Sequence, residues 1–495
     1  MVRRGTRSRI ALVASTVGVI AGTLAVAASA ADRVYWGGYG ASTPRISFAN
    51  LDGSGGGDLN SGLATVDEPF GIAIDLARGR ILWANDGGSA ISFANLNNTG
   101  GGGNLNTSGV SVYDPEGIAI DPAIGRVYWT NTPGGPDTGV SFANLNNTGG
   151  GGHLNTSGAT VNNPEGIAID PAAGKVYWGD NGGSPKRISF ANLNNTGGGG
   201  TLNTGAAIVN NPGGMAIDPT ARRIYWTNFS GTSISFANLD NTGGGGTLNT
   251  NGATVDHPLG LGIDPIAGKI YWANDSGPDQ GIWFANLDNT GGGGKVLTGM
   301  ATVDGPAFAT LLERPRSAAT PAVTGGNVAA THLACSRGRW AGDLLGAFLY
   351  RIPQHFAYRW SRNGVDNPGA TASSYNATLT GVYRCRVSAT NAAGTTQQTS
   401  APHKVFPKAK ITKAKISSAK GRARFTFISS GGGNGFQCAL VNKHKKKKGK
   451  KPTPSFSACK SPKRYKNLTP GKYTFEVRAL SSAGAGPAAK RGFAI

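Results

Sequence analysis

Residues 164–193 read PEGIAIDPAAGKVYWGDNGGSPKRISFANL, and this pattern recurs along much of the chain. It contains three short segments rich in β-branched and aromatic residues, separated by Gly, Pro, Asn and Asp, which is typical of strands joined by turns. Six residue pairs that end in tryptophan recur at intervals of 46 to 49 residues. Five are Tyr-Trp and one is Leu-Trp: Tyr35-Trp36, Leu82-Trp83, Tyr128-Trp129, Tyr177-Trp178, Tyr225-Trp226 and Tyr271-Trp272. Such a period indicates a propeller, a solenoid or another array, in which no unit buries its apolar face alone.

Each copy is predicted to contain four strands, which we name A to D. In the quoted copy, strand A covers 164–170, strand B follows at 174–178, strand C at 187–193 and strand D at 206–209. Four strands in each of six copies predict a six-bladed β-propeller. No segment keeps the 3.6-residue period of a helix for three turns, so the fold class is all-β.

The two ends of the array predict a closed ring. The first copy begins at strand B, Val34-Tyr35-Trp36, and has no strand A before it. After the last copy comes a single unpaired strand, 306–312, which can supply the missing strand A. A blade built from both ends would remove the exposed sheet edges that invite aggregation.

The copies resemble the YWTD repeats, also called class B repeats, of the low-density lipoprotein receptor family. The shared pattern is Pro-x-Gly-Ile-Ala-Ile-Asp, then Tyr-Trp, then Ala-Asn-Leu-Asp/Asn, and it covers residues 32–312. NHL-type propellers share only the Gly-Ile-Ala-Ile-Asp element. The Asp that follows Tyr-Trp-Thr in the family survives here only as Asp180, and the other copies carry Asn or Gly. Ligand sites of receptor members therefore do not transfer to this chain.

The face made by the D–A and B–C loops is where propellers usually bind ligands, and here the B–C loops vary while the others are nearly uniform. The candidate ligand-binding residues on this face are Phe70, Glu116, Glu165, Asn131, Asp137, Asp180 and Phe229. Glu116 and Glu165 occupy equivalent places in adjacent copies, where they could meet a cation or a basic ligand. The alternative is a pair of solvated carboxylates at the rim.

Catalysis is poorly supported by the sequence. The repeated aspartates of strand A recur too regularly to be catalytic and are predicted to cap turns, and the tryptophans are predicted to be core anchors. The propeller has two histidines, no metal-ligand spacing and no Gly-x-Ser-x-Gly elbow. We therefore predict no catalytic residue, metal or cofactor. A calcium-dependent hydrolase or lyase, with its ion held by Glu116, Glu165, Asn162 and Asn210, is the alternative.

The first 30 residues read as a signal peptide, which predicts an exported protein. Four arginines precede an apolar stretch that ends in the small-x-small site Ala28-Ser29-Ala30. A membrane anchor is the alternative reading, because the apolar stretch is nearly long enough to span a bilayer. No later segment is apolar enough to span, so the mature protein is expected to be secreted or associated with the cell surface.

Two further domains are predicted after the propeller (31–313), at 314–404 and 405–495. All four cysteines lie there, and three pairings are conceivable. We predict Cys335–Cys385 and Cys438–Cys459, because each pair lies within one compact module. Residues 314–404 resemble a bacterial immunoglobulin-like domain, with Trp360 between the cysteines and Tyr383 two residues before the second. Residues 405–495 are similar to small β-sandwich modules of bacterial surface proteins.

Charge is unevenly distributed. Residues 31–313 hold 12 Lys/Arg and 23 acids, a net −11, whereas residues 405–495 hold 22 Lys/Arg and one acid, a net +21. The candidate envelope-binding residues lie in a Lys-rich run: Lys443, Lys445, Lys446, Lys447, Lys448, Lys450 and Lys451. This run is expected either to bind an anionic envelope polymer or membrane surface or to be a soluble loop. Nucleic acid is not favoured, since no aromatic residues alternate with the lysines.

The sequence thus predicts an exported, non-enzymatic binding or scaffold protein. Its propeller face would recognise a protein or a glycan, its middle module would act as a spacer, and its basic module would associate with the cell envelope.

Overall fold

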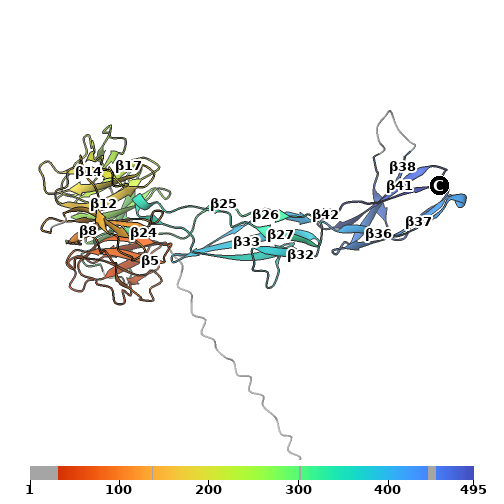
Figure 1. The fold of residues 1–495 in the computed structure, drawn as a ribbon, viewed down its shortest axis with the longest axis horizontal. Helices are drawn as coiled ribbons and strands as arrows, with labels where there is room; N and C mark the ends of the chain where they lie inside the picture. The colour runs from red at the N-terminus through yellow and green to blue at the C-terminus, as the bar shows by residue number, and fades with distance from the viewer. Residues whose placement is uncertain (1–31, 136–137, 300, 302, 444–452) are drawn as a thin grey trace, which may run out of the picture.

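The computed structural model describes residues 32–135, 138–299, 301, 303–443 and 453–495. The described chain is all-β apart from two single-turn 3-10 segments, η1 (Leu345–Ala347) and η2 (Ser418–Lys420). A disc formed by the N-terminal repeats is followed by two smaller modules in a row, which gives an elongated molecule (Figure 1). The predicted signal peptide lies outside the described residues. No described helix has the length and apolar character needed to cross a membrane.

The disc is a β-propeller. Its first sheet has five strands, in the order β29 (Leu349–Tyr350), β24 (Thr310–Leu312), β1 (Arg33–Gly37), β2 (Ile46–Asn50) and β3 (Gly56–Asp58). The second sheet contains β4 (Pro69–Asp75), β5 (Arg80–Asn85), β6 (Ala90–Asn95) and β7 (Gly103–Asn104). The third contains β8 (Pro115–Asp121), β9 (Arg126–Asn131), β10 (Gly139–Asn144) and β11 (Gly152–His153). The fourth contains β12 (Pro164–Asp170), β13 (Lys175–Asp180), β14 (Arg187–Asn192) and β15 (Gly200–Thr201). The fifth sheet contains β16 (Pro212–Asp218), β17 (Arg223–Asn228), β18 (Ser233–Asn238) and β19 (Gly246–Thr247). The sixth contains β20 (Pro258–Asp264), β21 (Lys269–Asn274), β22 (Gly281–Asn286) and β23 (Gly294–Lys295).

The repeated residues build the core as the sequence predicts. All six repeat tryptophans are fully buried, and the repeated basic residue of strand B lies over the Phe of strand C, as Lys175 does over Phe190. The strand A aspartates cap turns: the Asp218 carboxylate accepts hydrogen bonds from the backbone N–H groups of Thr220 and Ala221. These residues therefore hold the repeat together.

The predicted pairing of the two chain ends is confirmed. β24 pairs antiparallel with β1, with Tyr35 opposite Thr310 and Arg33 opposite Leu312. An isolated bridge between Gly38 and Pro306 extends the pairing. The orphan strand thus becomes the inner neighbour of the first strand, and the ring has no unpaired inner edge there.

The position predicted for the outermost strand is wrong. Residues 206–209 form no strand, and the fourth strand is the two-residue β15 inside the preceding Gly loop, paired with Ser189 and Phe190. The chain reverses within that loop through residues with positive φ, including Asn195 and Gly197. The segment at 206–209 instead leads to the next inner strand, and its Ile208 carbonyl accepts a hydrogen bond from the Trp226 indole.

The glycine-rich loops also join neighbouring blades. In five of them an asparagine with positive φ accepts a hydrogen bond from a backbone N–H of the preceding blade, as Asn195 does from Asn155. The preceding residue, such as Asn194, closes the turn by accepting from the backbone N–H and hydroxyl of Thr196. These contacts show that the glycine-rich loops are tight turns.

The middle module has its own hydrophobic core around Trp360, Cys385 and Val387. Its sheets contain β25 (Ser317–Ala319) with β28 (Arg339–Trp340); β26 (Val323–Gly325), β27 (Thr331–Cys335) and β32 (Ser374–Ala377); and β30 (His355–Arg362), β31 (Val365–Asp366), β33 (Gly381–Asn391), β34 (Gly394–Thr399) and β35 (His403–Val405). The predicted Cys335–Cys385 disulfide is confirmed and joins β27 to β33.

A segment of the middle module enters the disc. Ala347, Phe348, Leu349 and Tyr350 are fully buried and belong to the hydrophobic core of the disc. β29 adds to the first sheet parallel to β24, with Leu349 opposite Leu311, and η1 contacts the inner strands β8, β12, β16 and β20. We call residues 344–350 the plug. The plug explains why the stretch from Cys335 to Trp360 is long.

The C-terminal module contains β36 (Lys408–Ser417), β37 (Arg422–Ser430) and β40 (Lys463–Tyr465) in one sheet, and β38 (Gly435–Asn442), β39 (Ser457–Cys459), β41 (Lys472–Ser481), β42 (Gly484–Ala485) and β43 (Ala489–Ala494) in the other. A third core around Phe425, Phe427 and Phe475 lies between the sheets. The predicted Cys438–Cys459 disulfide is confirmed.

Candidate functional site

The candidate site lies where the inner strands of the disc begin. Glu116 and Glu165 are the second residues of β8 and β12, and the equivalent positions carry Phe70, Gly213 and Leu259. The inner strands β4, β8, β12, β16 and β20 come close together because each carries a glycine at its third position. A β-carbon built on Gly117 would lie 2.6 Å from the Glu165 carbonyl oxygen, and one on Gly166 would lie 2.0 Å from the Gly213 carbonyl oxygen. The two glutamates are thereby held on neighbouring strands.

The surroundings of the glutamate pair contain polar atoms without hydrogen-bond partners. Glu116 Oε2 is buried and has no partner among the described residues. Asn181, in the B–C loop after β13, is 6% exposed. Neither of its amide atoms makes a hydrogen bond of good geometry with a described residue, although the amide lies beside Glu165. Buried polar groups are normally paired, so unpaired ones beside two carboxylates mark a place where a ligand can supply the missing bonds.

Burial raises the pKa of both glutamates. The pKa of Glu116 is raised well above its usual value, first by desolvation and then by the negative charges of Glu165, Asp86 and Asp114. Burial also raises the pKa of Glu165 to about 7, although the nearby Asn181 amide and Lys186 ammonium oppose the rise. The raised pKa values favour the protonated forms of the pair, and a cationic group placed between the carboxylates would favour their ionised forms.

A third carboxylate extends the site toward its rim. Burial raises the pKa of Asp86 to about 6, with further contributions from the charges of Asp114 and Glu68, while the Tyr39 hydroxyl opposes the rise. The Tyr39 ring packs edge-on against Phe70, with ring centroids 5.3 Å apart. The site thus has an acidic side, formed by Glu116, Glu165 and Asp86, and an aromatic side next to it.

Aromatic rings connect this site to the plug. Phe70 lies 6.4 Å from Phe308 between ring centroids, and Phe308 lies 5.4 Å from Phe348 of the plug. On the opposite side of the disc, Tyr350 and Gly346 pack near the ends of inner strands, beside Ile74 and Ile169 respectively. The plug therefore fills the end of the disc opposite the glutamates, so the glutamate face is the accessible end of this axis.

The other predicted ligand-binding residues do not join the glutamate pair. Asn131 is fully buried and accepts a hydrogen bond from the Trp129 indole. Asp180 is 2% exposed and accepts from the Trp178 indole and the Asn162 backbone. Both hold the B–C turn in place, which their position two residues after the tryptophan could have indicated. Phe229 packs edge-on against His257, and Asp137 lies outside the described residues.

The Lys-rich run is mostly outside the described residues. Of its candidate residues only Lys443 is described, as an exposed residue at the end of β38; Lys445, Lys446, Lys447, Lys448, Lys450 and Lys451 are not. Among the residues that the structure describes, no three His, Cys, Asp or Glu side chains gather closely enough to hold a metal ion.

Comparison with known proteins gives likenesses of limited extent. No protein-family model matches the chain, and no curated protein does. Solved structures that are similar include a nidogen/laminin complex (16% identity, 57% of this chain and 98% of that chain, TM-score 0.44). A putative TolB from Agrobacterium tumefaciens is also similar, with 10% identity over 57% of this chain and 96% of that chain and a TM-score of 0.40. So is a putative 6-phosphogluconolactonase from Bacteroides uniformis, with 13% identity over 57% of this chain and 99% of that chain and a TM-score of 0.38. At these values no function follows from the likenesses.

Proposed function

We propose that this chain is an exported, non-enzymatic binding or scaffold protein. In this proposal a six-bladed propeller of the YWTD type recognises a protein or a glycan through the glutamate face. An immunoglobulin-like module acts as a spacer, and a basic β-sandwich module associates with the cell envelope. The ordering of the modules along the molecule (Figure 1) would hold the disc away from the envelope.

The observation that carries the proposal is the glutamate pair beside the Asn181 amide. Glu116 and Glu165 are partly buried carboxylates with raised pKa values, and the Asn181 amide lies beside Glu165 without a hydrogen bond of good geometry to a described residue. An ammonium or guanidinium group of a partner would pair with the carboxylates, and a carbonyl or hydroxyl would satisfy the amide. Such groups occur on proteins and on glycans. The plug fills the opposite end of the disc, so it does not block their approach to the glutamates.

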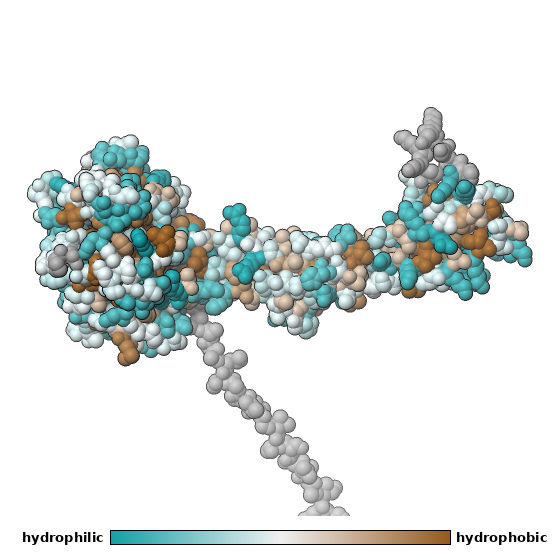
Figure 2. Space-filling view, viewed as in Figure 1, coloured by the Kyte–Doolittle hydropathy of each residue, from teal (hydrophilic) through white to brown (hydrophobic). Residues whose placement is uncertain are grey.

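Two contacts support the immunoglobulin-like assignment. The Tyr383 hydroxyl donates a hydrogen bond to the Leu379 carbonyl, as in a tyrosine corner, and Trp360 is fully buried beside the Cys335–Cys385 disulfide. On the visible face, the middle module is coloured mostly in pale shades, without a strongly hydrophobic or hydrophilic patch (Figure 2). This agrees with the role of a spacer.

The glutamate face can be tested with matched variants of the chain 32–495. Immobilised wild-type protein is used to capture proteins and glycans from the envelope of its own host. The E116Q/E165Q variant should reduce the affinity for the genuine partner at least 10-fold, because each buried charged pair lost costs more than 1.4 kcal/mol.

The control is D240N/D288N, which removes two charges from exposed loop turns where three of the other copies already have Asn. It should leave binding unchanged. Partners that bind wild type and E116Q/E165Q equally would contradict the proposed face.

Envelope association is tested separately. Removing residues 405–495 should release the protein from cells, and added salt should release the intact protein, because exposed charge contacts are screened. Equal retention with and without these residues would contradict the role of the basic module.

A further inference from the structure

The outward face of the first sheet of the C-terminal module carries seven exposed cations and no acid. We call it the basic face: Lys408, Lys410, Lys413, Lys415, Arg422, Arg424 and Arg464. It lies on β36, β37 and β40, apart from the Lys-rich run. The residues between these cations, such as Ala409, Ala423 and Phe425, point inward and are buried.

A β-bulge keeps the lysines of β36 on one face. Lys408 and Lys410 are two residues apart, as are Lys413 and Lys415, but the two pairs are separated by an odd number of positions. In a regular strand an odd step would turn the second pair inward. The register shifts between Ile411 and Lys413, with Thr412 as the extra residue, so all four lysines are exposed.

The basic face places like charges directly opposite one another. Lys415 pairs with Arg424 across β36 and β37, and Arg424 pairs with Arg464 across β37 and β40. Such cross-strand pairs are destabilising. None of the seven cations forms an ion pair with a described residue, and the single acid of this module, Glu476, pairs with Lys490 of β43 at 3.1 Å. The fold thus keeps a repulsive arrangement that an anionic ligand would neutralise.

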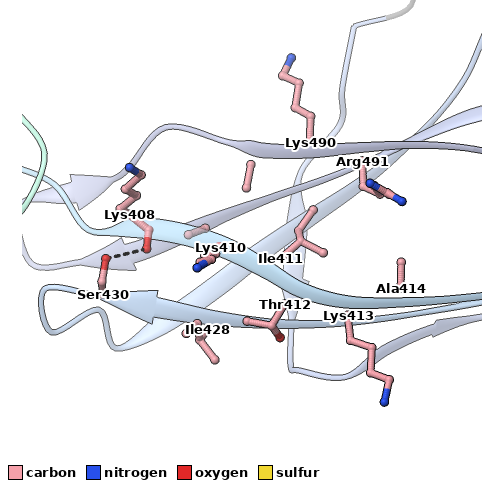
Figure 3. Close-up of a pocket in the computed structure, with 12 residues that line it drawn as sticks. Lys408, Lys410, Ile411, Thr412, Lys413, Ala414, Ile428, Ser430, Lys490 and Arg491 are labelled. Atoms are coloured by element: carbon pink, nitrogen blue, oxygen red, sulfur yellow. Dashed lines mark hydrogen bonds between the residues drawn. The ribbon is translucent and has the colours of Figure 1, made fainter.

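The sheet is hollowed at both ends of the basic face. One groove, of about 720 Å³, runs between β36 and β43, with Ile411 and Ile428 beside Lys408, Lys410 and Lys413. Figure 3 shows these lysines spread along the strand with Arg491 on the neighbouring one. A second groove, of about 490 Å³, is lined by Lys415, Arg422, Arg424 and Arg464. The basic face joins the two grooves into one track.

We propose that the basic face binds a linear polyanion of phosphodiesters that carries no bases. Alternate residues of a strand are about 7 Å apart, so the lysines of β36 present charges at regular intervals to an extended chain. A track along strands suits such an extended chain. The one aromatic side chain that lines the two grooves, Tyr465, packs edge-on against Phe425 and Phe475 of the core. This arrangement disfavours nucleic acid, whose bases stack on exposed rings. This inference rests on the proposed envelope association and names its ligand.

The test uses the chain 32–495 and end-labelled poly(glycerol phosphate), titrated over a range of sodium chloride concentrations. The K410Q/K413Q/K415Q variant should weaken binding at least 10-fold at low salt. The slope of log affinity against log salt should fall by about 2, since each contact on a flexible polyanion contributes about 0.7. Because repulsion is relieved, this variant should unfold at the same temperature as wild type or higher.

The matched control is R339Q/K404Q/K472Q, which removes three exposed cations away from the basic face and should change the affinity less than threefold. An equal loss in both variants would overturn the inference in favour of non-specific charge. Tighter wild-type binding to oligothymidylate, or to phosphatidylglycerol vesicles, would overturn it in favour of those ligands. Self-association without polymer that the triple variant abolishes would overturn it in favour of the acidic disc of a second copy.

Envelope retention separates this inference from the proposed function. If the triple variant loses polymer binding and envelope retention together, the basic face is the attachment site. If it loses polymer binding but stays on the envelope like wild type, the inference is overturned while envelope association stands.

Discussion

At the scale of single residues, the glutamate pair makes the stability of the disc depend on pH. Burial raises the pKa of Glu165 from 4.5 to about 7, so the folded protein binds protons that the unfolded chain releases. The associated stability is fully present below about pH 4.5 and is lost as the pH rises through 7. The cost at pH 8 is on the order of 3 kcal/mol.

The variant E116Q/E165Q should therefore unfold at a higher temperature than wild type at pH 8 and at a similar temperature at pH 4.5. Thermal unfolding at the two pH values measures this difference. Glu313, whose pKa is also raised, to about 8, is common to both proteins and cancels in the comparison. Asp86, whose pKa is raised to about 6, repels the glutamates, so the loss of their charges makes its ionisation easier in the variant and adds to the gain at pH 8. D240N/D288N should show no gain at pH 8. A variant that is no more stable than wild type at pH 8 would show that the pair is solvated.

A second prediction concerns the glycines that bring the inner strands together. In G166A the new methyl group would lie 2.0 Å from the Gly213 carbonyl oxygen, so a backbone must move. We expect a loss of about 3 kcal/mol or more in the free energy of unfolding, measured with a denaturant. G183A is the control, because its nearest neighbour, the Pro185 carbonyl oxygen, is 3.6 Å away. It should change stability by about 0.5 kcal/mol or less.

At the scale of elements, the plug couples the middle module to the disc. Phe348 is fully buried against Phe308, so F348A should lower the stability of the disc by about 3–5 kcal/mol. Hydrogen exchange should show faster exchange in β24 and β1. F356A removes the same ring from the middle module, where Phe356 packs on Trp340, and should leave exchange in β24 and β1 unchanged. Unchanged protection in F348A would mean that the plug does not support the disc.

The sequence predicts those elements whose signals are local and repeated. The Tyr-Trp pairs fixed the buried strands, and the missing strand at one end with the extra strand at the other predicted the β24–β1 pairing. The predicted position of the outermost strand was wrong because the strand has only two residues, Gly200 and Thr201. A turn and the pairing with β14 hold these residues in a strand, and their intrinsic β-propensity does not indicate one. For the site, the repeat predicted that Glu116 and Glu165 occupy equivalent places in adjacent copies, but it could not reveal the Asn181 amide beside them.

Two features were missed although the sequence carried a trace of each. The plug appears as an apolar run, 344–350, inside an unusually long interval between Cys335 and Trp360. Its destination in another module depends on long-range packing that no local pattern encodes. The basic face appears as Lys-x-Lys-x-x-Lys-x-Lys at 408–415, and without the bulge this spacing does not read as one face.

At the scale of the whole molecule, the disc core does not end where the repeats end. Because residues 347–350 complete it, the fragment 32–313 should unfold at a lower temperature than the fragment 32–405. It should also bind a hydrophobic dye that the longer fragment excludes, since the seat of the plug is uncovered. Calorimetry and dye fluorescence check both points. Equal unfolding temperatures and equal dye binding would show that the disc is complete without the plug.

The joint between the disc and the middle module has a mechanical consequence. The chain crosses it at Glu313, again through β29 and once more near Asn391, whose side chain donates to the Glu313 carbonyl. If the C-terminal module is attached to a surface and the disc binds a moving partner, several chain segments at this joint share the tension. A single flexible linker would carry it alone. The joint would then transmit torque and tension between the disc and the middle module, and the disc would not rotate freely about it.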